Sequence, residues 1–159
     1  MKKRIAFLLA IFLFLPACHR AEAANSSLEV LSTRILNAVS DKEAFVAADE
    51  DFLSDNFGSF DYIEDSNIFL DSDNATREFG IFRITDRRKA TEFKQAVQEY
   101  LSNEQKALES LAALYPTQEL ESRLSLYQNA TVGNEGMLVY YLVLNKEETR
   151  KAIEALTGR

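Results

Sequence analysis

Carboxylates are the most abundant groups that could do chemistry in this chain. Positions 41 to 73, which we call the acidic segment, hold eleven acidic residues and one basic residue, Lys42. Several oxygen ligands in one place can hold a hard cation such as Ca²⁺, and a dense negative surface attracts a basic protein or another cationic ligand. A solvated acidic face without any ligand is the alternative. The candidate binding residues are Asp49, Glu50, Asp51, Asp55, Asp61, Glu64, Asp65, Asp71 and Asp73.

Two more specific functions of these carboxylates can be weighed from their spacing. Asp71-x-Asp73 begins like an EF-hand loop, but Thr76 stands where that loop needs glycine and Phe82 where it needs a bidentate glutamate. Glycoside hydrolysis needs two carboxyl groups about 5 to 9.5 Å apart, and among 25 acidic residues such pairs arise by chance. A Ca²⁺-stabilised extracellular module and a carboxylate-dependent envelope hydrolase therefore stay as alternatives to a binding protein.

Most other enzyme chemistries are excluded by residue type. The chain has one histidine, His19, and one cysteine, Cys18, so Ser-His-Asp, Cys-His and multi-histidine zinc sites lack their parts. The sequence contains no G-x-S-x-G, S-x-x-K or Walker A motif. We therefore expect a non-enzymatic protein with no catalytic residues, no cofactor and no metal site.

Two other groups of side chains could contact a ligand. Five basic residues surround the start of a predicted long helix, where they could bind a phosphate-bearing wall polymer, although pairing with the acidic segment explains them as well. Several tyrosines could stack on a ligand, but aromatic residues in strands usually belong to the core. The basic residues are Arg83, Arg87, Arg88, Lys89 and Lys94, and the tyrosines are Tyr62, Tyr127, Tyr140 and Tyr141.

The N-terminus has the layout of an export signal. Lys2-Lys3-Arg4 precedes an apolar run from Ile5 to Leu15, which is too short to span a bilayer because spanning takes about 20 residues. The following Leu15-Pro16-Ala17-Cys18 closely resembles a bacterial lipobox. That resemblance implies cleavage before Cys18 and a diacylglyceryl group on its sulfur. Cleavage after Ala21-Glu22-Ala23, which would release a soluble secreted protein, is the alternative.

These signals divide the chain into three parts. We expect a lipoprotein signal peptide at 1–17, the lipidated cysteine and a short tether at 18–26, and a single α+β domain at 27–159. Loss of the signal lowers the number of basic residues from 18 to 15 and leaves 25 acidic ones, a formal net charge of −10. Such a chain is a poor partner for nucleic acid. Acyl chains, at about 0.8 kcal/mol per buried CH₂, would hold it on the outer face of the bacterial cytoplasmic membrane.

Hydrophobic periodicity and capping residues predict the elements of the domain. The pattern favours an α+β fold in which a small antiparallel sheet of three to four strands carries helices mainly on one face, with one long central helix. The apolar run 137–144 should be the central strand of that sheet. The predicted helices begin near Leu28, Lys42, Arg87, Gln118 and Lys146, and the predicted strands cover 67–70, 79–84, 129–132 and 137–144.

Part of the domain resembles a known family. Asn74-Ala75-x-x-Glu78-x-Gly80-Ile81-Phe82 leads into the predicted long helix, which closes on Tyr115-Pro116-x-Gln118 before a strand pair and a last helix. This arrangement, over about residues 45–157, is similar to domain of unknown function 4358, found in lipoproteins of Gram-positive bacteria. The last strand begins Gly136-Met137-Leu138, where that family usually has Gly-Asn-Tyr. The resemblance implies an envelope location and brings no catalytic residues, since that family has no assigned activity.

Overall fold

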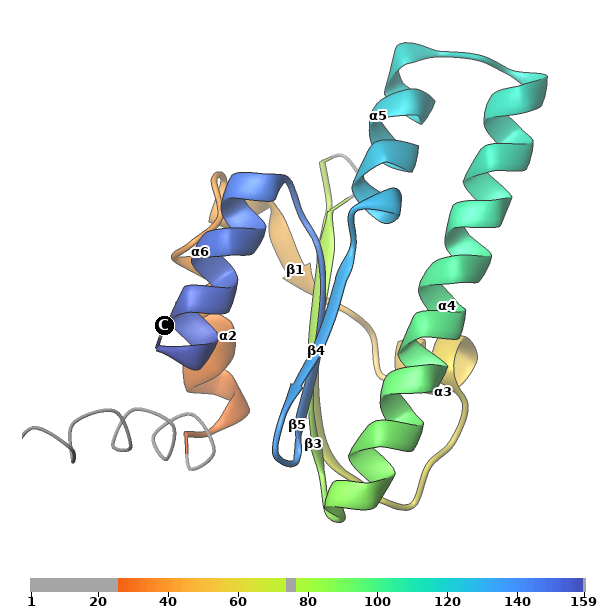
Figure 1. Ribbon diagram of the computed structural model, residues 1–159. Helices are drawn as coiled ribbons and strands as arrows, with labels where there is room; N and C mark the ends of the chain where they lie inside the picture. Colours follow the sequence, from red (N-terminus) through yellow and green to blue (C-terminus); the bar gives the residue numbers. More distant parts are fainter. Residues whose placement is uncertain (1–25, 74–76, 159) are drawn as a thin grey trace, which may run out of the picture.

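A five-stranded antiparallel sheet with helices on both faces forms the domain (Figure 1). The computed structural model describes residues 26–73 and 77–158. The predicted α+β class and antiparallel sheet are confirmed, whereas the predicted number of three to four strands is wrong. In the order β1-β2-β3-β5-β4, the strands are β1 (Phe45–Ala47), β2 (Ile63–Asp71), β3 (Glu78–Ile84), β5 (Leu138–Val143) and β4 (Thr131–Glu135).

The extra strand lies where the sequence predicted a helix starting near Lys42. Asp41 takes a left-handed backbone conformation (φ 53°) and only a 3-10 turn, η2 (Lys42–Ala44), follows it. Phe45 then pairs with Asp71 across β2, and Val46 with Leu70. The predicted edge strand at 67–70 is correspondingly longer, and it lies inside the sheet because β1 covers its outer side. Tertiary pairing thus overrides a local capping pattern.

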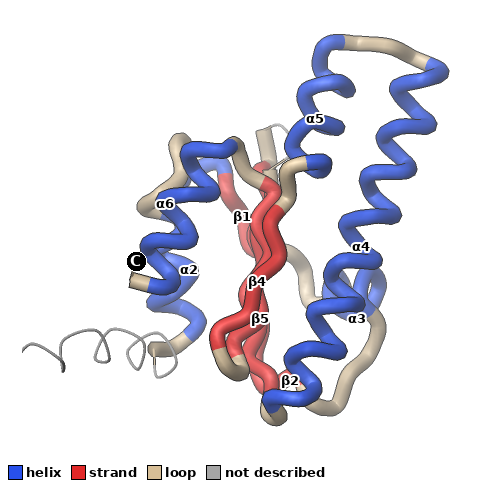
Figure 2. Tube along the Cα trace, in the orientation of Figure 1, coloured by secondary structure: helices blue, strands red, loops and turns tan. Residues whose placement is uncertain are grey.

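The helices form two layers, one on each face of the sheet (Figure 2). Helices α2 (Leu28–Leu36) and α6 (Lys146–Thr157) cover one face. Helices α3 (Phe52–Phe57), α4 (Arg87–Leu114) and α5 (Gln118–Gln128) cover the other. The long central helix is therefore confirmed, and the prediction that helices pack mainly on one face is wrong. Within the described part of the chain, no helix is both long and apolar enough to cross a bilayer.

Strand β5 shows why both faces are covered. All six of its residues are buried, and successive side chains of a strand point to opposite faces. Val139, Tyr141 and Val143 pack under α4, while the side chains between them pack under α2 and α6. A strand that is apolar on both faces needs a layer on each side. The predicted central strand is thus an interior strand, next to β3 at the centre of the sheet.

Capping side chains fix where the helices begin. The Asp86 carboxylate accepts from the backbone N–H of Arg88 at the start of α4, and the Thr117 hydroxyl accepts from Leu120 at the start of α5. Asn145 accepts from two backbone N–H groups at the start of α6. These side chains satisfy amide groups that a helix leaves without partners. The sequence predicted all three starts correctly, because capping is a local interaction.

Candidate functional site

Glu78 is a buried carboxylic acid at the first position of β3. Because side chains alternate along a strand, Glu78 shares a face with Phe82 and Ile84, which belong to the core beneath α3, α4 and α5. Only 4% of Glu78 is exposed. The Tyr100 hydroxyl of α4 lies 3.0 and 3.1 Å from its two carboxyl oxygens. The fold therefore places an acid inside the apolar layer and supplies it with a phenolic partner.

Burial raises the pKa of Glu78 to about 7, because the charged form loses its hydration. The nearby carboxylate of Glu104 adds to this rise, while the hydroxyls of Tyr100 and Tyr127 oppose it by favouring the charged form. None of the ion pairs between described residues includes Glu78. At neutral pH, Glu78 is thus poised between its protonated and ionised forms.

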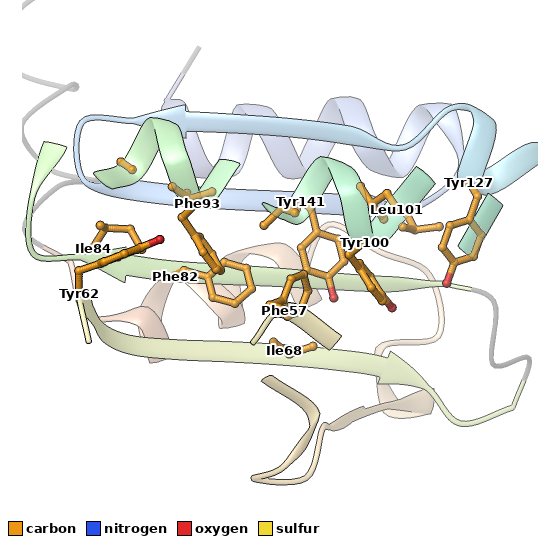
Figure 3. Close-up of a cluster of buried hydrophobic side chains, with 14 of the residues drawn as sticks. Phe57, Tyr62, Ile68, Phe82, Ile84, Phe93, Tyr100, Leu101, Tyr127 and Tyr141 are labelled. Atoms are coloured by element: carbon orange, nitrogen blue, oxygen red, sulfur yellow. The ribbon is translucent and has the colours of Figure 1, made fainter. Parts of the chain in front are cut away.

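Tyr141 brings a third phenol toward the same carboxyl group. Its side chain is fully buried, and its hydroxyl has no hydrogen-bond partner among the described residues. Glu78 is one of the groups that raise the pKa of Tyr141, after burial itself. Figure 3 shows the hydroxyl ends of Tyr100, Tyr127 and Tyr141 directed toward β3, the strand that carries Glu78. A buried hydroxyl without a partner is uncommon in a folded protein.

The approach of Tyr141 to β3 depends on a glycine. A Cβ atom built on Gly80 would lie 2.3 Å from Cε1 of Tyr141, which is far inside van der Waals contact. Gly80 is paired with Tyr141 across the β3–β5 ladder. The aromatic cluster around it includes an edge-to-face pair of Phe82 and Phe93, with ring centroids 4.8 Å apart. Each such pair contributes about 0.5–1.5 kcal/mol beyond its buried area, and Tyr100 and Tyr141 form another edge-to-face pair of this cluster.

A cavity of about 370 Å³ opens above Glu78, between the end of β2 and helices α4 and α5. This Glu78 cavity has an apolar wall made by Val46, Phe52 and Leu70. Ligand pockets typically combine such a wall with a few polar groups that orient the ligand. The remaining lining residues are polar or charged, and they are Asp71, Ser72, Arg77, Glu78, Glu104, Arg123 and Tyr127.

Arg77 forms one side of the cavity and is held by two carboxylates. Its Nε donates to Asp71 at 2.7 Å, and one of its terminal nitrogens donates to Glu148 of α6 at 3.0 Å. The guanidinium group also lies over the Phe45 ring, 5.1 Å from the centroid. Glu148 accepts from the backbone N–H of Ser40 at 3.0 Å. This network neutralises Arg77 and ties the start of β3 to α6.

The nine predicted acidic residues do not form one continuous surface. Asp71 is 1% exposed and bonded to Arg77, because it lies at the paired end of β2. Asp73 lies just beyond that end. The other seven surround α3 and the start of β2, at Asp49, Glu50, Asp51, Asp55, Asp61, Glu64 and Asp65. Three of them, Glu50, Glu64 and Asp65, line a second hollow of about 380 Å³.

Metal-binding geometry is not found among the described residues, where no three acidic, histidine or cysteine side chains converge on a common point. Among the basic residues at the start of α4, Lys89 pairs locally, since it donates to Glu92 at 2.7 Å and lies over the Tyr62 ring. Glu92 also accepts from the Tyr62 hydroxyl at 3.3 Å.

Cys18, the predicted lipidation site, lies outside the described residues.

Glu78 is not among the functional residues that the sequence predicted. The only signal was an acid at the head of an apolar strand, Glu78-Phe79-Gly80-Ile81-Phe82, which equally fits a solvent-exposed strand end. Its tyrosine partners come from α4, α5 and β5, at positions 100, 127 and 141. The sequence predicted Tyr127 and Tyr141 to be core residues, and both are buried in the core, as is Tyr100. Their convergence on one carboxyl group follows only from the packing of α4 and α5 on the sheet.

No family model matches this chain, and neither a curated protein nor a solved structure is significantly similar to it. The resemblance to domain of unknown function 4358 therefore stays a prediction.

Proposed function

We propose that the chain is a lipid-anchored binding protein of the bacterial cell envelope, and that its ligand enters the Glu78 cavity. The anchor is inferred from the lipobox-like sequence that ends at Cys18. The binding role is inferred from a cavity of ligand size that combines an apolar wall with a buried acid. The acidic segment is then a second, outer feature of the protein, and the cavity is its main binding site.

The observation that carries the proposal is the buried Glu78 carboxyl group at the cavity. An apolar residue of similar size would stabilise this position better, because burying an ionisable group costs free energy. Titratable groups with perturbed pKa values in clefts are good candidates for functional residues. The tyrosine hydroxyl partners compensate only part of the burial, since the pKa of Glu78 stays raised.

A neutral probe tests whether the cavity binds small molecules. The mature protein, reconstituted in nanodiscs with ¹³C-labelled leucine and valine methyl groups, is titrated with pentan-1-ol, and empty nanodiscs correct for partitioning. We expect the Leu70 methyl signals to shift, because Leu70 lines the cavity. Val30 is 44% exposed on α2, across the sheet, and its signals should not move.

A blocking variant gives this experiment a matched control. Val46 lines the cavity and is 48% exposed, so Val46→Trp should fill the entrance without disturbing the core. Met137 is 46% exposed and is not among the lining residues, so Met137→Trp adds the same bulk elsewhere. Binding of pentan-1-ol should fall only in Val46→Trp. A Leu70 signal that does not shift at about 20 mM pentan-1-ol would refute the cavity as a binding site. The limit is set at this concentration because an affinity of about millimolar is the weakest useful one.

The anchor has its own test. Intact-mass analysis of the mature protein should give a chain that begins at Cys18 and carries a diacylglyceryl group, and Cys18→Ala should abolish membrane association. An unlipidated chain beginning at Ala24 would instead establish the secreted soluble form.

A carboxylate-dependent envelope hydrolase is a second candidate, because Glu78 and Glu104 line the same cavity and the pKa of Glu78 is raised to about 7. A protonated Glu78 could donate a proton to a leaving group while Glu104 acts as the second carboxylate. Release of soluble reducing ends from purified cell wall, lost in both Glu78→Gln and Glu104→Gln, would favour this function over simple binding.

The acidic segment is a candidate surface for a basic partner, since Glu50, Glu64 and Asp65 line one hollow. Binding there should weaken as salt is added, because exposed charges are screened over about 10 Å at 0.1 M ionic strength. An affinity that does not change with salt would count against this surface.

A further inference from the structure

We propose that the Glu78 cavity selects a cation, namely a protonated primary amine carried on a short apolar chain. The ammonium group would pair with the Glu78 carboxylate, and the carbon chain would lie against Val46, Phe52 and Leu70. This inference rests on the proposed binding function and names the ligand class for the same cavity.

The Glu78 carboxyl group has only neutral partners among the described residues. Its hydrogen bonds come from a neutral donor, the hydroxyl of Tyr100, and none of the ion pairs between described residues includes it. An ionised carboxylate in a desolvated site is stabilised most by a cation at contact distance. Among the described residues, shape and hydrogen bonds are thus provided at Glu78 without an ion-pair partner, and an ammonium group would supply that partner.

Charged and titratable groups face Glu78 from α4 and α5. Glu104 of α4 adds negative potential. Tyr100 and Tyr127 stay neutral, since burial raises the pKa of each further above its ordinary value. Arg123 of α5 also lines a neighbouring hollow that contains Glu119. Arg123 lines the Glu78 cavity as well, so its positive charge offsets that of Glu104 and the ionisation of Glu78 decides the net sign there.

The charged and titratable groups that face the cavity from the sheet do not add a positive charge at Glu78. Arg77 is engaged by Asp71 at 2.7 Å and by Glu148 at 3.0 Å, so its charge is already balanced. Tyr141 of β5 is fully buried and its pKa is raised by burial, so it also stays neutral. The unbalanced charge at the cavity floor is therefore negative whenever Glu78 is ionised.

Binding of an amine should consequently be linked to a proton. Below pH 7 Glu78 holds a proton that the amine must displace, so the affinity for the amine should fall about tenfold for each pH unit. A neutral alcohol of the same length makes the same apolar contacts without the ion pair. Its affinity should depend only weakly on pH.

The test uses pentylamine, pentan-1-ol and pentanoate on the nanodisc-bound mature protein, with the Leu70 methyl signals as readout from pH 5 to pH 8. We expect pentylamine to bind about tenfold more tightly than pentan-1-ol at pH 8 and to lose this advantage by pH 6. In Glu78→Gln, which keeps the side-chain size, pentylamine should bind only as well as the alcohol does in the same variant.

The outcomes separate this inference from the proposed function. Equal binding of amine and alcohol at every pH, or tighter binding of pentanoate, would overturn the selection of a cation and leave the cavity as a binding site. Failure of all three probes to shift Leu70 would overturn the binding function as well. Because the pH series is measured on the unaltered protein, the inference stays testable even if Glu78→Gln does not fold.

Discussion

Replacing Glu78 by glutamine should remove a pH dependence of folding that the structure assigns to this residue. The pKa of Glu78 is about 7 in the folded protein and 4.5 in an unperturbed chain. The folded state therefore binds the proton more tightly than the unfolded state. The stability that this contributes is complete below pH 4.5 and is lost as the pH rises through about 7.

The size of the effect follows from the difference between the two pKa values. Each pKa unit corresponds to about 1.4 kcal/mol, so Glu78 should contribute a loss of about 3 kcal/mol in unfolding free energy between pH 4.5 and pH 8. The conversion needs little correction for solvent screening, because the side chain is 4% exposed. Glutamine cannot titrate, so the variant should lack this loss and become more stable than the unaltered protein at pH 8.

Urea denaturation followed by circular dichroism at pH 5, 6, 7 and 8 measures the unfolding free energy of both chains. The difference between them isolates Glu78 from the other acidic residues. Glu147→Gln on α6 is the matched control, since Glu147 is exposed and Arg150 lowers its pKa. Its difference from the unaltered protein should be flat over this range. A flat difference for Glu78→Gln would refute the reasoning, because it would mean that Glu78 is ionised throughout.

Three substitutions test the framework around the site. Arg77→Met removes the cation that Asp71 and Glu148 share. It should lower the unfolding free energy, measured by urea denaturation, by about 3–5 kcal/mol. A loss below about 1 kcal/mol would show that this ion-pair network does not stabilise the fold. Gly80→Ala places a methyl group against Tyr141 and should cost about 1–3 kcal/mol, seen as a lower melting temperature, while an unchanged value would show that the ring can move. Asn145→Ala removes the cap of α6 and should cost about 1 kcal/mol, whereas Asn145→Ser should recover most of it.

Local interactions explain which elements were predictable. The starts of α4, α5 and α6 depend on Asp86, Thr117 and Asn145, each of which accepts from a backbone N–H within three residues. Strands at 129–132 and 137–144 were also predicted; the first lies slightly later, as β4, and Gly136 takes the left-handed conformation (φ 67°) in the turn that joins β4 to β5. In each case the stabilising partners are close in sequence, so the pattern of residues is sufficient.

Long-range pairing explains what was missed. The segment 45–47 carries a helical pattern, but its backbone pairs with β2 more than twenty residues later. The helix layers on both faces follow from β5, whose uniformly apolar sequence did not reveal which helix would cover which face. Strand pairing also explains why the predicted acidic residues do not share one surface. Asp71 is buried at a paired strand end, while Asp49 lies in an exposed segment.

The sequence by itself predicted an export signal with a lipobox-like end at Cys18. It determined the α+β class, the long helix and the absence of histidine and cysteine side chains from residues 27–159. Only the tertiary structure decided that Glu78 lies at a cavity beneath α4 and α5 with three tyrosines around it. The physical reason is that the ionisation of a carboxyl group depends on its hydration and its neighbours. Both are set by residues more than twenty positions away in the chain, which come together only when the helices pack on the sheet.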